Sequence, residues 1–152
     1  MSDRLVMKDV RWLNPSQWCI LLDAAHVGVL AGEAFVFSLD DGTANGIGIY
    51  KTSGSGALNA YVNNPVPLGV TVADGERFRA AITWSDGGAS ASAAINGRQP
   101  VPVKTTKRVW PTALSIGSAR DNLFVSTLWA RALQYWPQRM SDKDLSHLTR
   151  LT

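Results

Sequence analysis

Residues 77–84 read Arg77-Phe78-Arg79-Ala80-Ala81-Ile82-Thr83-Trp84, and Phe78, Ala80, Ile82 and Trp84 place an apolar side chain at every second position. Successive side chains of a β-strand point to opposite faces of the sheet, so this stretch predicts a half-buried strand. The turn residues 86–88 follow, and residues 89–95 return as a second apolar run. Asn96-Gly97 then supplies a pair that tolerates the positive φ angles of a tight hairpin. The segment therefore predicts an antiparallel sheet.

The same period of two, interrupted by turn residues, continues through most of the chain. It predicts further strands near residues 5–10, 18–23, 34–39, 47–50, 58–62, 68–72, 114–116 and 123–136. About eleven short strands are typical of a sandwich or a jelly roll, with an up-and-down barrel as the alternative.

The last residues follow a different pattern. Ser141 can cap a helix and Asp144 can return the hydrogen bond, while Leu145, Leu148 and Leu151 share one helical face. We expect this helix to cover the core. The sequence thus predicts one all-β domain over residues 1–152, a two-sheet antiparallel jelly-roll sandwich with a short C-terminal helix.

Length and composition agree with a single domain. The chain has 152 residues, 45% hydrophobic and 18% charged, so it can bury a core without disulfides or metals. Its single cysteine, Cys19, lies in an apolar run and is expected to be buried. The net charge of +3 comes from dispersed residues, which favours solubility and gives no argument for a nucleic acid partner. We find no signal peptide and no stretch near the roughly 20 apolar residues of a membrane span, so no membrane partner is expected.

Several motifs, in order along the chain, resemble a known family. Ile95-Asn96-Gly97, Leu114-Ser115-Ile116-Gly117, the segment Leu128 to Pro137 and the segment Arg139 to Thr149 resemble the closing strands and helix of concanavalin A-like, laminin-G-like jelly-roll domains. The similarity is greatest to the domains at the C-terminal ends of bacteriophage tail fibre and tail proteins. Trp12-Leu13-Asn14-Pro15 and the segment Phe37 to Asn45 are similar to two further motifs of that family. These motifs are structural, so they indicate a fold more strongly than a ligand.

The resemblance implies a non-catalytic carbohydrate- or receptor-binding module of a tail fibre or tail-tip protein. Such a protein is made in the bacterial cytoplasm, is located in the virion and attaches to a host-surface glycan or receptor. Fibre tips are usually trimeric, and three linked copies strengthen weak binding, so we expect a homotrimer. The alternative is a structural virion module, for trimerisation or capsid decoration, that binds no glycan. A wide apolar patch with Val109 or Trp110 favours that alternative, and an aromatic side chain in a polar groove favours a ligand.

No catalytic motif is present. Glycosidases of this fold place two or three carboxylates on one strand face, but Glu33 and Glu76 lack an acidic partner two or four residues away. Asp40 and Asp41 are adjacent, and adjacent side chains of a strand point to opposite faces. A nucleophile elbow, paired histidine ligands and a Cys-x-x-Cys motif are absent. We expect no enzymatic activity and no cofactor.

Binding candidates come from aromatic and polar residues in predicted loops, since sugar sites combine aromatic platforms with planar polar groups. The candidate ligand-binding residues are Trp110, Arg120, Asp121, Asn122, Asp40, Asp41 and Asn45. Asp40, Asp41 and Asn45 also offer the oxygen ligands that Ca²⁺ prefers, although nothing else supports a metal. For this loop and for the loop 120–122, the competing interpretation is a turn whose polar side chains form hydrogen bonds only within the loop or with water. Trp84, Trp129 and Trp136 lie in alternating patterns and are expected in the core.

Overall fold

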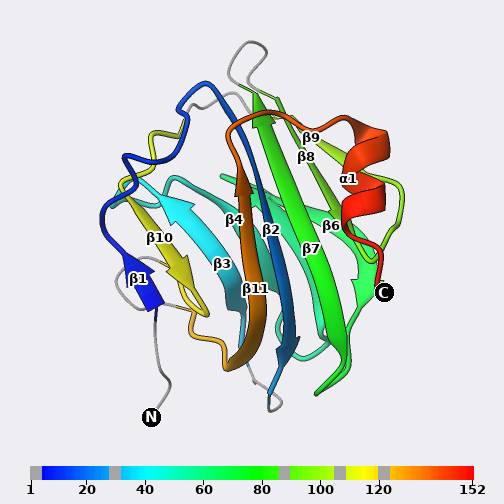
Figure 1. Ribbon diagram of the computed structural model, residues 1–152. Coiled ribbons are helices and arrows are strands. Elements are labelled where there is room, and N and C mark those ends of the chain that lie inside the picture. The colour runs from blue at the N-terminus through cyan, green and yellow to red at the C-terminus, as the bar shows by residue number, and fades with distance from the viewer. Residues whose placement is uncertain (1–4, 28–31, 86–89, 105–108, 120–123) are drawn as a thin grey trace.

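The computed structural model describes residues 5–27, 32–85, 90–104, 109–119 and 124–152. Within these ranges, two antiparallel sheets pack face to face (Figure 1). The six-stranded sheet has the order β1 (Leu5–Met7), β10 (Ala113–Ile116), β3 (Ala34–Asp40), β4 (Gly46–Lys51), β5 (Ala57–Val62) and β6 (Pro65–Thr71). The five-stranded sheet has the order β11 (Leu128–Trp136), β2 (Gln17–His26), β7 (Arg77–Ser85), β8 (Ser90–Ile95) and β9 (Val101–Lys104). The predicted sandwich is confirmed.

The core lies between the sheets and follows the predicted alternation. On β7, Phe78 and Ile82 point inward and pair with Ala24 and Ile20 of β2. Trp84 pairs with Trp18 one step further, and the two rings stack with centroids 6.5 Å apart. All of these side chains are at most 1% exposed. Burial of such large apolar groups contributes roughly 1.5–3 kcal/mol each, which makes this layer the main source of stability.

Helix α1 (Asp142–Leu148) begins as the sequence predicts. The Ser141 hydroxyl oxygen accepts a 3.2 Å hydrogen bond from the Asp144 backbone N–H and donates a 2.6 Å bond to the Asp144 carboxylate. Leu145 is fully buried against Cys19, Leu21, Ala81 and Ala94. The helix therefore covers the outer face of the five-stranded sheet, over β7 and β8 (Figure 1). It shields a second, smaller cluster rather than the core between the sheets.

The structure differs from the sequence predictions at four places. Leu151 is 45% exposed and lies beyond the helix, so it does not share the buried face of Leu145. Strand β9 was not predicted, because Pro100 and Pro102 interrupt its pattern. Strand β11 begins at Leu128, not at residue 123. Trp129 is 67% exposed, because it lies on the outer face of the edge strand β11, where no element covers it.

Two other expectations, for Cys19 and for the turn at Asn96-Gly97, are confirmed. Cys19 is buried, and this burial raises the pKa of its thiol to about 12. Asn96 and Gly97 both have positive φ, and the Arg98 N–H donates to the Ile95 carbonyl, as a tight turn requires. No helix among the described residues has the length and apolarity needed to cross a membrane.

Candidate functional site

The outer face of the six-stranded sheet carries a row of aromatic and polar side chains. In β3, a bulge between Phe35 and Phe37 lets Val36 and Phe37 both reach the core, while Phe35 and Ser38 point outward. The register then places Phe35 beside Tyr50 of β4. Tyr61 of β5 lies two strands away from Ser38, across Gly48.

Four aromatic rings enclose a pocket on this face. The Phe35 ring centroid lies 5.4 Å from that of Tyr50, 5.5 Å from that of Tyr61 and 6.0 Å from that of Phe124. Aromatic pairs at these separations stabilise one another by about 0.5–1.5 kcal/mol beyond their burial. The pocket has a volume of about 440 Å³, which is in the range of small-ligand sites. Its other lining residues are Glu33, Ser38, Asp40, Thr43, Ala44, Asn45, Gly46, Pro65 and Ala119.

The pocket is hollow because β4 carries no side chains on this face near its start. Ile47 and Ile49 point into the core, so Gly46 and Gly48 lie on the outer side. A Cβ atom at Gly48 would lie 2.2 Å from the carbonyl oxygen of Phe37, a separation that no side chain can adopt. Glycine is therefore required at this position by the close approach of the bulged strand β3.

Polar groups that line the pocket form hydrogen bonds within the chain. The Asp40 carboxylate accepts a 3.0 Å bond from the Gly42 N–H. The Ser38 hydroxyl donates to the Ser118 carbonyl at 3.2 Å. Burial, with added effects of Glu33 and Tyr61, raises the pKa of Tyr50, so its phenol stays protonated near neutral pH. The pocket lining thus contains carboxylate groups, from Glu33 and Asp40, and hydroxyl groups, among them those of Tyr50 and Tyr61.

The predicted site residues do not form one site. Asp40 and Asn45 line the pocket. Asp41 instead closes its own turn, because its carboxylate accepts hydrogen bonds from the Thr43 N–H and hydroxyl and from the Asn45 amide. Hydrogen bonds from Thr43 are the main reason that the pKa of Asp41 lies below its ordinary value. For Asp41 the self-bonded turn is the better interpretation.

The remaining candidates lie elsewhere. Trp110 is 52% exposed and lines a separate hollow of about 650 Å³ with the N-terminal segment 8–15, whereas Val109 is buried. Arg120, Asp121 and Asn122 lie outside the described residues. In the described part of the chain, no group of three or more His, Cys, Asp or Glu side chains is placed to hold a metal ion.

Sequence reasoning missed the aromatic walls of the pocket. The signal was present in Gly46-Ile47-Gly48-Ile49-Tyr50, where the positions opposite the core hold two glycines and then a tyrosine. Tyr61 likewise lies between core residues Ala60 and Val62. A strand whose outer face is nearly bare and ends in an aromatic residue indicates a concave surface rather than a solvated one.

The fold class is a two-sheet antiparallel β-sandwich, and comparison with solved structures supports that class. The chain resembles the CBM40 of the IT-sialidase from Ruminococcus gnavus, solved with α2,3-sialyllactose, with a TM-score of 0.70 and 12% identity over 90% of this chain and 83% of that one. It also resembles the leech intramolecular trans-sialidase (TM-score 0.72, 15% identity) over 90% of this chain but 24% of that one.

The NanB sialidase of Streptococcus pneumoniae gives a TM-score of 0.72 at 10% identity, over 95% of this chain and 26% of NanB. This chain therefore spans about a quarter of the length of the two whole sialidases. At such low identities the likeness concerns the fold alone. No family model and no curated protein sequence matches the chain.

Proposed function

We propose that the chain is a non-catalytic carbohydrate-binding module, and that the pocket on the six-stranded sheet binds a neutral sugar unit. The observation that carries this proposal is the aromatic pocket of Phe35, Tyr50, Tyr61 and Phe124. Aromatic faces pack against the apolar C–H face of a sugar ring, while a few placed polar groups fix its orientation. Asp40 and Asn45 can take part in hydrogen bonds with sugar hydroxyls.

The charge of the pocket supports a neutral ligand. Its described ionisable lining residues are Glu33, Asp40, Tyr50 and Tyr61, and none of them is cationic at neutral pH. Among the described lining residues, a sugar carboxylate would meet two carboxylates and no compensating positive charge, which is unfavourable. Sugar hydroxyls, in contrast, donate to carboxylate oxygens, and such charge-assisted hydrogen bonds are strong.

The biological setting is proposed from the similar solved structures and from the sequence motifs. Two Ruminococcus gnavus CBM40 structures with a similar fold contain sialyllactose, which favours a glycan as the ligand class. The motif resemblance adds the setting of a bacteriophage tail fibre or tail tip, where the module attaches the virion to a host-surface glycan. We propose the virion as its location and propose that the bound glycan is not cleaved.

The test is a screen of the purified chain against host-surface oligosaccharides, followed by calorimetry on the neutral glycans that bind. Tyr61→Ala removes one pocket wall and is expected to weaken binding about tenfold, equivalent to about 1.4 kcal/mol. Trp110→Ala is the matched control, since it removes an exposed aromatic ring from the separate hollow. Equal affinities of the wild type and Tyr61→Ala, or release of a cleaved product, would contradict the proposal.

A second candidate function, contact between subunits, is favoured by the open edge of the six-stranded sheet. Strand β1 pairs with β10 on one side and, within the described residues, with no strand on the other. Leu5, Met7 and Trp12 are 60%, 40% and 39% exposed. An unpaired edge with exposed apolar side chains is a suitable surface for assembly. We propose a homotrimer that uses this edge.

Light scattering is expected to give a trimer mass for the wild type and a smaller mass for Leu5→Lys. A monomeric wild type at micromolar concentration would argue against the trimer.

A further inference from the structure

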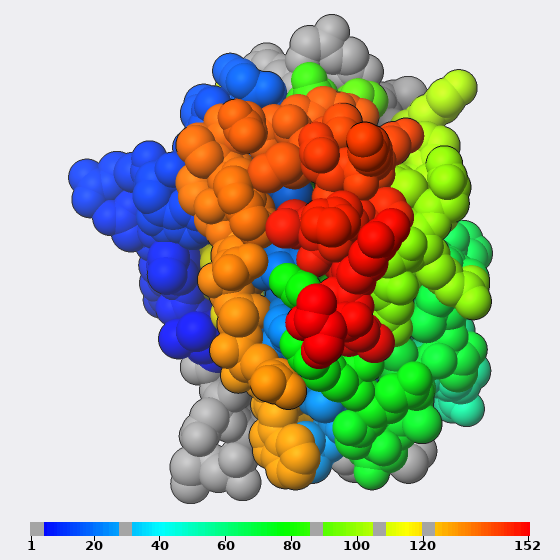
Figure 2. Space-filling model, turned by 45° about the vertical axis from the view of Figure 1, so that its right-hand side comes forward, coloured from blue at the N-terminus to red at the C-terminus, as the bar shows by residue number. Residues whose placement is uncertain are grey.

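The outer face of the five-stranded sheet is hollowed between β11 and α1, and strands β2 and β7 form the floor of the hollow (Figure 2). At the end of this face where β11 and β7 begin, the register places Trp129 of β11, Ala25 of β2 and Arg77 of β7 in one row. The backbone positions of Trp129 and Arg77 are therefore about 10 Å apart, with only a methyl group between them.

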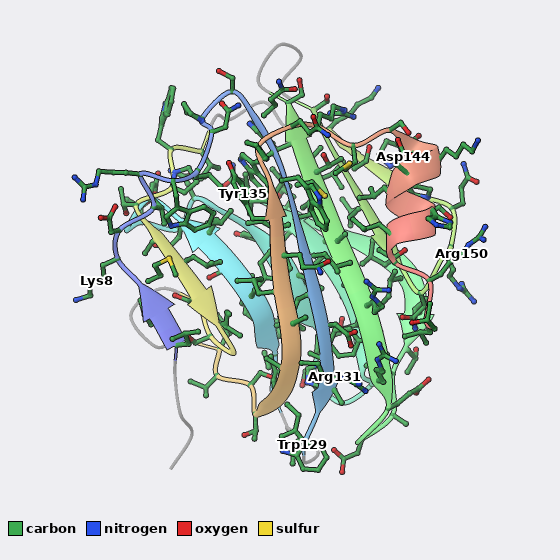
Figure 3. The ribbon with its side chains drawn as sticks, in the orientation of Figure 1. Lys8, Trp129, Arg131, Tyr135, Asp144 and Arg150 are labelled. Carbon is green, nitrogen blue, oxygen red and sulfur yellow. The ribbon has the colours of Figure 1, made fainter. Side chains whose placement is uncertain are left out.

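A bulge in β11 adds a cation to this surface. Ala130 pairs with Ala24 and Ala132 pairs with Asp23, so Arg131 is an extra residue between them. Arg131 is exposed, and it lies beside Trp129 at the lower end of β11 (Figure 3). Its charge contributes to the low pKa of Asp23, which places the guanidinium near the outer-face carboxylate.

The other two arginines of this face already have partners. Arg77 donates two hydrogen bonds, of 2.9 and 2.6 Å, to the Asp23 carboxylate and a third, of 3.0 Å, to the Thr152 backbone oxygen. Arg79 donates to the Arg150 carbonyl at 2.9 Å and lies 3.7 Å from the Asp23 carboxylate. Arg131, in contrast, forms no hydrogen bond or ion pair with any described residue.

Trp129 is likewise available. Its 67% exposed side chain makes no hydrogen bond and no ring contact with the described residues. An exposed indole presents a large, rigid apolar face to a ligand. An exposed indole next to an unpartnered guanidinium combines a stacking surface with a planar pair of N–H donors.

We propose that Trp129 and Arg131 form a second binding site, for a sugar that carries a carboxylate. The apolar face of the sugar ring packs on the indole of Trp129, and the sugar's carboxylate accepts two parallel N–H hydrogen bonds from Arg131. This site lies on the opposite side of the sandwich from the pocket and extends the proposed function from neutral to acidic saccharides.

The local charges favour one carboxylate over a polyanion. Asp23 keeps a negative charge beside Arg77 and Arg79 and occupies their guanidinium groups, so a run of phosphates would meet one available cation and one carboxylate. Nucleic acid binding needs several unpaired basic groups along a path. A uronic acid needs one cation for each bound ring.

The test is calorimetry with trigalacturonic acid and with its neutral trimethyl ester. We expect the acid to bind at least tenfold more tightly than the ester. Arg131→Gln and Trp129→Ala should each weaken binding of the acid at least tenfold, and Arg131→Lys should fall between them and the wild type, because it keeps the charge but loses the planar pair of donors. Arg11→Gln is the matched control, since it removes an exposed arginine from the N-terminal segment.

Several outcomes would overturn the proposal: no binding of the acid, equal binding of acid and ester, or wild-type affinity in Arg131→Gln. If Tyr61→Ala abolishes binding of the acid and Arg131→Gln does not, the acid occupies the pocket instead. Tighter binding of a thymidine oligonucleotide than of the acid would indicate a nucleic acid surface. If the wild type binds the acid but no neutral glycan, the function proposed for the pocket is wrong and the proposal for Trp129 and Arg131 is supported.

Discussion

The two outer faces of this sandwich differ in how their side chains are used. On the six-stranded sheet, Gly46 and Gly48 leave a bare floor, and aromatic rings and carboxylates surround it. On the five-stranded sheet, α1 covers part of the face, and Trp129 and Arg131 lie on the uncovered part. One hollow comes from missing side chains and the other from the gap between a helix and an edge strand.

The difference has a consequence for ligand chemistry. The described ionisable side chains of the pocket are acidic or phenolic, whereas the uncovered part of the five-stranded face carries Arg77, Arg79 and Arg131 around Asp23. The same fold can therefore present a surface suited to hydroxyl groups on one side and a surface suited to a carboxylate on the other.

The largest expected effect concerns the helix. Leu145 is 0% exposed, so Leu145→Asp places a carboxylate in an apolar cluster and should lower the free energy of unfolding by about 3–5 kcal/mol. Leu145→Ala, a milder change, should cost about 2–4 kcal/mol. Urea denaturation measures both.

Leu151→Asp is the control, because that side chain is 45% exposed and should change stability by about 0.5 kcal/mol or less. If Leu145→Asp unfolds like the wild type, the helix does not hold the five-stranded face, and the hollow beside it loses its structural basis.

An intermediate effect is expected from His26, whose strand β2 forms the floor of the second hollow. Burial is the main reason that the pKa of His26 falls to about 4. The unfolded chain binds this proton near pH 6.5 and the folded chain does not, so stability is complete above pH 6.5 and falls as the pH drops toward 4. We expect a loss of about 2 kcal/mol between pH 7 and pH 4.5 by urea denaturation.

His26→Gln removes the titrating group and should flatten this part of the profile. His26 pairs with Leu128, the neighbour of Trp129, so the acid-sensitive end of the sheet is also the end that carries the proposed acidic-sugar site. An unchanged pH profile in His26→Gln would show that the imidazole is not buried as described.

The smallest expected effect concerns the two proposed binding sites, which should not influence each other's affinity. The pocket and the Trp129 site lie on opposite faces of two sheets that pack about 10 Å apart. Substitutions that far apart with no shared partners usually add within about 0.5 kcal/mol. The double variant Tyr61→Ala with Arg131→Gln should therefore bind each sugar as the corresponding single variant does, as calorimetry can show. Coupling larger than about 1 kcal/mol would mean that the two faces act as one site.

Much of the fold was predictable from sequence because its signals are local. Alternation on β7, the Asn96-Gly97 turn and the Ser141 cap each depend on residues close together in the chain. The candidate sites were less predictable. Asp40 and Asn45 were found from their loop, but Phe35, Tyr50 and Tyr61 come from three separate strands. Trp129 was expected in the core, because alternation gives a face without saying whether another element covers it.

The sequence by itself determined most of the strands, the helix start and most of the buried positions between the sheets, since period, capping and turn chemistry act within a few residues. The tertiary structure decided which outer faces stay open. The register across β3, β4 and β5 brings the aromatic rings together, and the bulge in β11 adds Arg131 to the outer face. The docking of Leu145 covers part of the five-stranded sheet. These outcomes depend on contacts between residues far apart in the chain, which no local pattern contains.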